Sequence, residues 1–142
     1  MNTLRLLPRL SLICGLALLA FSTTTNAQDP QEEENLGEFF DRVPIPEGMS
    51  KEEIQGMCAM VLATREWTVQ KKTDRRVVGY IQHGGAEATV TMRFGGEAVE
   101  IFCEGWDLNR AGERVKPFVP KRWLAYLRKD LLNRLKEFST TR

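Results

Sequence analysis

The sequence predicts an α+β fold in the order α-β-β-β-β-α, a four-stranded antiparallel meander with two helices packed on one face. Apolar residues recur at helical spacing from 54 to 62 and again from 124 to 138. Between 67 and 103 they alternate with mostly polar residues at a period of two. The stretches between the alternating segments are short enough for hairpins and too short for parallel crossovers.

The first helix is predicted to begin at Ser50, because Ser50 and Glu53 have the spacing of a capping box. Met49 and Ile54 occupy the positions of the hydrophobic staple that accompanies such a box. The helix then carries one apolar stripe, which should face the core: Ile54, Met57, Cys58, Val61 and Leu62.

Four alternating segments predict the strands, and their apolar residues should face the helices. These segments are Trp67/Val69, Val77/Gly79/Ile81, Ala88/Val90/Met92/Phe94 and Val99/Ile101/Cys103. Turn-forming residues at 73–74, 83–85 and 95–96 separate them, as expected of hairpin turns.

A polar connection is expected over residues 105–119, followed by the final helix. Pro120 suits the first turn of that helix. Leu124, Leu127, Leu131, Leu135 and Phe138 form its apolar stripe. The α+β domain is therefore predicted to span residues 50–139, with a short tail at 140–142.

The N-terminal segment, residues 1–27, has the features of a secretory signal peptide: an arginine-containing start, an apolar run and small polar residues. Its apolar run is about 12 residues, shorter than the ~20 that span a bilayer. We therefore expect an exported protein, periplasmic or secreted, with no transmembrane span after cleavage. Residues 28–49, acidic and containing Pro30, Pro44 and Pro46, are expected to form a poorly structured lead-in. Its phenylalanines, Phe39 and Phe40, could dock on the domain.

Two cysteines remain after removal of the signal segment, Cys58 and Cys103. Disulfides form and persist outside the cytoplasm, and both cysteines fall on apolar faces of their elements. We therefore expect a Cys58–Cys103 disulfide, which would stabilise the fold by about 4 kcal/mol.

Residues 65–135 resemble a family of small exported bacterial proteins of unknown function. The resemblance rests on a helix that ends near a "GWTV"-type strand, on a hairpin sheet and on a last helix with a tryptophan followed by a leucine and an acidic residue. The corresponding residues here are Glu66-Trp67-Thr68-Val69, Ala88-Thr89-Val90-Thr91, Val99-Glu100-Ile101 and the helix from Trp123 to Asp130. Glu66 stands where the family usually has glycine. The resemblance implies the fold and supplies no catalytic residue.

Few residues offer chemistry. The chain has 142 residues, 42% hydrophobic and 27% charged, with a formal net charge of +1, which suits one globular domain and argues against a nucleic-acid partner. His83 is the only histidine, so a hydrolase would have to combine it with a carboxylate such as Glu87. We expect no catalytic residue, no cofactor and no metal site, and we keep the small hydrolase as an alternative.

Two surfaces are candidates for binding. If the apolar strand residues face the helices, an aromatic and polar set faces away and forms an open sheet face: Tyr80, Thr91, Arg93 and Phe102. The second candidate is the cationic side of the last helix, with Lys121, Arg122, Arg128 and Lys129. Residues 28–63 hold nine acidic and two basic residues, so an internal counter-ion for this helix is the other interpretation.

These features favour a non-catalytic binding or interaction module of the cell envelope or the secreted fraction. Its partner would be a protein, a peptide, an anionic envelope component or a second copy of the chain. A hydrolase inhibitor is a further alternative, suggested by small size, export and the expected disulfide.

Overall fold

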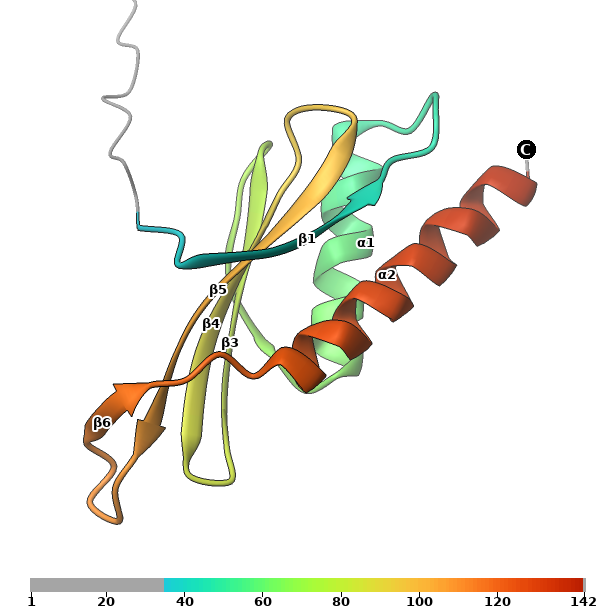
Figure 1. The fold of residues 1–142 in the computed structure, drawn as a ribbon. Coiled ribbons are helices and arrows are strands. Elements are labelled where there is room, and N and C mark those ends of the chain that lie inside the picture. Colours follow the sequence, from blue (N-terminus) through green and yellow to red (C-terminus); the bar gives the residue numbers. More distant parts are fainter. Residues whose placement is uncertain (1–34, 142) are drawn as a thin grey trace, which may run out of the picture. The chain divides into compact units, whose positions relative to one another are not determined.

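The structure is a computed structural model that describes residues 35–141. In this range the chain forms a six-stranded antiparallel sheet and two helices (Figure 1). The elements are β1 (Glu38–Pro44), α1 (Lys51–Thr64), β2 (Thr68–Lys72), β3 (Arg76–His83), β4 (Ala86–Arg93), β5 (Ala98–Leu108), β6 (Arg114–Pro117) and α2 (Lys121–Thr140). The predicted signal segment, residues 1–27, lies outside the described residues.

The α+β class and the antiparallel hairpins are confirmed, but the predicted number of four strands is wrong. The strand order is β1-β5-β4-β3-β2, and β6 also pairs with β5. The meander from β2 to β5 is the predicted one. Two short strands were missed, β1 before the first helix and β6 before the last, so the element order is not α-β-β-β-β-α.

Strand β1 also moves the boundary of the folded unit, which was predicted at residue 50. Glu38 to Pro44 pair with Cys103 to Ala98 of β5, and Val43 is buried in the core. Pro44 had argued against regular structure here. It is the last residue of an edge strand, where a missing backbone donor disturbs no ladder. The folded unit therefore includes residues that we expected to form a lead-in.

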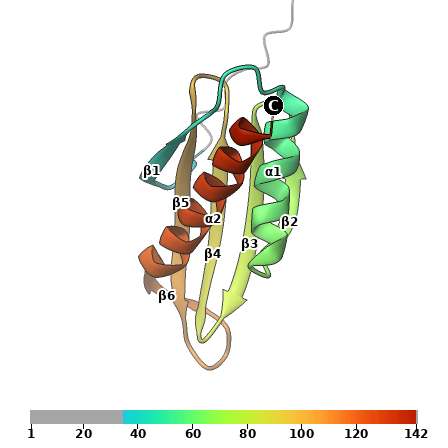
Figure 2. The same ribbon diagram turned by 90° about the vertical axis from the view of Figure 1, so that its right-hand side faces the viewer.

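Both helices cover the same face of the sheet (Figure 2). Helix α1 packs on β2 and β3, and α2 packs on α1 and β1. The predicted capping box forms at Ser50, whose hydroxyl accepts from the Glu53 amide while Glu53 accepts from the Ser50 amide. Gly79 on β3 lets α1 approach closely, since a Cβ there would lie 3.0 Å from the Leu62 side chain.

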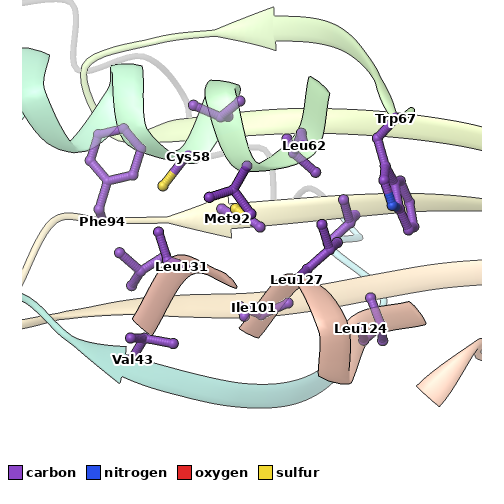
Figure 3. Packing of buried hydrophobic residues seen from close by; sticks show 14 of the residues in the cluster. Val43, Cys58, Leu62, Trp67, Met92, Phe94, Ile101, Leu124, Leu127 and Leu131 are labelled. Atoms are coloured by element: carbon purple, nitrogen blue, oxygen red, sulfur yellow. The ribbon is translucent and has the colours of Figure 1, made fainter. Parts of the chain in front are cut away.

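The core lies between the helices and the sheet (Figure 3). The predicted stripe leucines of α2 supply one side of it: Leu124, Leu127, Leu131 and Leu135 are all buried. Trp67 closes one end, with 3% of its surface exposed. The side chains that were expected to face the helices are therefore the ones that fill the core.

The predicted Cys58–Cys103 disulfide is absent, and both residues are buried free thiols. Cys58 points from α1 into the core beside Met92 and Phe94 (Figure 3). Its helix packs on β2 and β3, whereas Cys103 lies on β5, which is two strands away from β3. Neighbouring strands are about 4.8 Å apart, so this offset is larger than the Cα separation that a disulfide accepts. Sharing one core did not bring the two sulfurs together.

Candidate functional site

The face of the sheet turned away from α1 and α2, which we call the outer face, carries all four residues predicted for it. Thr91 of β4 lies opposite Phe102 of β5, and Arg93 lies opposite Glu100. Tyr80 of β3 lies opposite Thr89 of β4. Thr89 is two residues before Thr91, so it lies on the same face of the sheet. Neither helix covers the outer face (Figure 1).

An aromatic pair forms the centre of the outer face. The Phe39 and Phe102 rings meet edge to face with their centroids 5.6 Å apart. The Arg93 guanidinium lies over the Phe102 ring, 4.8 Å from its centroid. Phe39 was expected either to cover this face or to remain in a flexible lead-in. Instead β1 extends the sheet, and Phe39 widens the aromatic patch with 47% of its surface exposed.

Cations outnumber carboxylates beside this pair. The strand registers place Arg76, Arg93, Glu100 and Arg42 in one row across four strands. The Glu100 carboxylate forms ion pairs with Arg93 and Arg42, with nitrogen–oxygen distances of 3.0 and 3.7 Å. Two arginines, Arg93 and Arg42, therefore share one glutamate, so the group formed by these three side chains has a net positive charge.

At the opposite end of the outer face, the charge of Glu87 is compensated by neighbouring side chains of the same chain. The Tyr80 hydroxyl donates to a Glu87 oxygen at 2.8 Å, and the Arg114 guanidinium pairs with the same carboxylate. Arg114 also lies over the Trp106 ring. These donors lower the pKa of Glu87, the Tyr80 hydrogen bond contributing most, and the same hydrogen bond raises the pKa of Tyr80.

The four predicted basic residues of α2 do not form one surface. Arg128 turns toward β1, where its Nε lies 2.5 Å from Asp41 Oδ2. Arg122 donates to the Tyr126 hydroxyl at 3.2 Å, which lowers the pKa of Tyr126. Lys121 and Lys129 are exposed. The Asp41–Arg128 pair joins the acidic N-terminal part to the basic helix, so part of the helix charge has an internal counter-ion.

An open pocket of about 450 Å³, which the sequence analysis did not predict, lies where α1 ends and α2 begins. We call it the Trp123 pocket. Trp67, Ile81 and Trp123 supply its apolar side chains. The Trp123 ring contacts the rings of Trp67 and His83, with centroid distances of 6.5 and 6.2 Å. Thr64, Arg65, Glu66, Gln82 and Tyr126 complete the lining. Residues far apart in sequence build it, so no local pattern could reveal it.

Glu66 sits at this pocket in a backbone conformation that favours glycine. Helix α1 ends in a Schellman motif: the Trp67 amide donates to the Leu62 carbonyl and the Glu66 amide to the Ala63 carbonyl, both at 3.0 Å. The motif requires a left-handed residue after the helix, and Glu66 has φ 64°. Glu66 is the only described non-glycine residue with a positive φ.

Glu66→Gly is expected to stabilise the fold by about 1 kcal/mol, because glycine adopts φ 64° without the steric cost that a Cβ adds. Urea unfolding of the two proteins measures the difference. The matched control is Glu97→Gly, at an exposed carboxylate without a positive φ, which should not stabilise. A Glu66→Gly protein that is less stable than the parent would show that the glutamate side chain makes a compensating contact.

Within residues 35–141, His83 forms no hydrogen bond or ion pair with a carboxylate. Its ring contacts Trp123, whereas Glu87 is held by Tyr80 and Arg114 on the outer face. Among residues 35–141 no cluster of three metal-ligating side chains occurs, and no helix is long and apolar enough to cross a bilayer. The structure thus does not pair His83 with Glu87, the carboxylate that was named as an example for the hydrolase alternative.

The chain matches no family model, no curated protein and no solved structure. The resemblance to small exported bacterial proteins therefore stays a prediction, and the outer face and the Trp123 pocket have to be interpreted from their own geometry.

Proposed function

We propose that the protein is a non-catalytic binding module of the cell envelope or the secreted fraction, and that its outer face docks an acidic, partly apolar segment of a partner protein. The observation that carries the proposal is the position of Arg93, which lies over the Phe102 ring and shares Glu100 with Arg42. An aromatic pair, of which Phe39 is exposed and Phe102 is half-buried, lies beside two arginines that share one carboxylate.

Aromatic and arginine side chains are the residue types that dominate binding energy at protein interfaces. The Phe39–Phe102 pair offers apolar area that no helix covers. Arg93 is already held in place by the ring and by Glu100, so less side-chain freedom is lost when it binds a carboxylate. Charge complementarity favours an acidic segment over a basic one.

Selection from a displayed library of short random peptides tests this proposal. Selected peptides should be rich in Asp and Glu next to apolar residues, and their binding should weaken with salt. Phe102→Ala and Arg93→Gln should each weaken binding about tenfold or more. Arg110→Gln is the matched control, because Arg110 is an exposed cation in the turn between β5 and β6 and should leave binding unchanged.

Two results would overturn the proposal. One is selection of basic peptides, or of peptides whose binding is indifferent to Phe102→Ala and Arg93→Gln. The other is a self-associating protein that becomes monomeric with Phe102→Ala and selects no peptide, since a second copy of the chain would then occupy the outer face. Sedimentation of the parent and the variant distinguishes that case.

A further inference from the structure

The Trp123 pocket lies on the helix-bearing side of the sheet, so it is independent of the outer face. Strand β3 forms its base at a place where the sheet is open. The last residue pair between β2 and β3 is Thr68–Tyr80, and β3 continues to His83. Its last three residues therefore extend beyond β2.

Some polar side-chain atoms at the rim of the Trp123 pocket have no partner within the described part of the protein. Within the part of the chain that the structure describes, neither the Glu66 carboxylate nor the His83 ring takes part in an ion pair or a side-chain hydrogen bond. Arg65 gives Nε and Nη2 to Asp130, at 2.6 and 3.1 Å, which leaves its other terminal nitrogen for a ligand. The rim of the pocket thus carries a guanidinium, a carboxylate and an imidazole, and its floor is apolar.

The charged and polar groups at the rim, together with the apolar floor, favour one class of ligand over others. A purely apolar ligand would bury the rim groups without hydrogen bonds, which is unfavourable. A ligand with several charges of one sign would meet Arg65 and Glu66, which have opposite signs, at the same rim. A neutral ligand with one apolar face and many hydroxyl groups satisfies both parts, because its carbon face can lie on an indole while its hydroxyls donate to Glu66 and accept from Arg65.

Glu66 adds an observation that the stability of the fold does not explain. Glycine suits its left-handed backbone position better, yet the chain carries a glutamate there, at the edge of the pocket. Strained residues of this kind are concentrated at functional sites. A carboxylate that hydrogen-bonds a ligand would account for the choice.

We infer that the Trp123 pocket binds a saccharide, one or two sugar rings in size, with a sugar face on Trp123 and hydroxyl groups on Glu66, His83 and Arg65. A volume of about 450 Å³ lies in the range of small-molecule sites. The inference does not rest on the outer face.

The test titrates the protein with glucose, galactose, N-acetylglucosamine and their β-1,4-linked disaccharides, and follows the indole N–H signals by two-dimensional NMR. At least one sugar should shift the Trp123 signal with a dissociation constant of about 1 mM or lower. The Trp106 signal is the internal control, because Trp106 of β5 lies on the outer face, opposite Glu87 of β4. Absence of any Trp123 shift with all of these probes would overturn the inference.

Glu66 variants separate binding from folding. Glu66→Gly should weaken sugar binding about tenfold or more while it raises the unfolding midpoint, so a loss of binding cannot be ascribed to a damaged fold. Glu66→Asn also tolerates the left-handed backbone and keeps a planar acceptor, and it should retain more of the affinity. Glu97→Gln, in the turn at the other end of β4, should change nothing. Equal affinity of Glu66→Gly and the parent would contradict the assigned role of Glu66.

Discussion

Replacing Gly105 with alanine is expected to lower the free energy of unfolding by about 3 kcal/mol, the upper end of the usual cost of overpacking. A Cβ on Gly105 would overlap the Phe118 carbonyl oxygen and lie 3.1 Å from the Glu87 carbonyl oxygen. Both obstacles are backbone atoms, so no side-chain rotation relieves the clash. The Phe118 amide also donates to the Gly105 carbonyl at 2.9 Å, which fixes the two segments together.

The effect should be visible as a fall of about 10 °C or more in the melting temperature. Gly96→Ala is the matched control, since a Cβ there meets nothing within 4 Å and Gly96 does not have a positive φ. If Gly105→Ala melts within a degree or two of the parent, the close approach of β5 to the segment at Phe118 is wrong. That segment leads into α2, so the variant should also broaden the NMR signal of Trp123.

Local signals in the sequence predicted the elements that depend on local physics. The capping box at Ser50 and the apolar stripe that follows it specify α1 without reference to the rest of the chain. The period-two alternation of β3 and β4 predicted which side chains face the helices, because a strand has only two faces. The outer face followed from the same alternation, and Tyr80, Thr91, Arg93 and Phe102 do share it.

The missed strands depend on a partner far away in sequence. Strand β5 is 11 residues long, and two short strands share its edge: β1 ends its pairing at Cys103, and β6 begins at Trp106. Neither segment has an alternating pattern of its own, since β6 is four exposed residues ending at a proline. Gly37 and Gly105 permit the crowding at this junction, where a Cβ on either would overlap a backbone carbonyl oxygen of the neighbouring segment.

The Trp123 pocket was missed for a similar reason. Trp67 was predicted as a core-facing strand residue, and it lies in the core, with Trp123 of α2 packed against the core beside it. The hollow is lined by residues from the end of α1, from β3 and from α2, and β3 continues beyond its last residue pair with β2 there. Glu66 stands where glycine is usual in the family that the sequence resembles, but its backbone angle could not be read from the residue type, so it did not reveal the pocket.

Both cysteine thiols are expected to resist alkylation in the folded protein by at least about a thousandfold relative to the unfolded chain at pH 8. Burial raises the pKa of Cys58 from 9.0 to about 12, and burial together with nearby Glu104 and Glu38 raises that of Cys103 to about 12. Iodoacetamide labelling without reductant, with peptide mapping to separate these sites from Cys14, measures the rates. Unfolded protein should take up label at both positions. A disulfide would leave both unlabelled until a reductant is added.

The same thiols make stability depend on pH in a defined direction. Their pKa values are higher in the folded state than in the unfolded one, so the neutral thiol is favoured by folding and the stabilisation is complete below pH 9. As the pH rises from 9 toward 12, the unfolded chain ionises first, and each thiol should cost about 1.4 kcal/mol per pH unit. Urea unfolding at several pH values measures the slope. A variant with Cys58→Ala and Cys103→Ala removes this contribution while other groups still titrate, so equal slopes in parent and variant above pH 9 would contradict two buried free thiols.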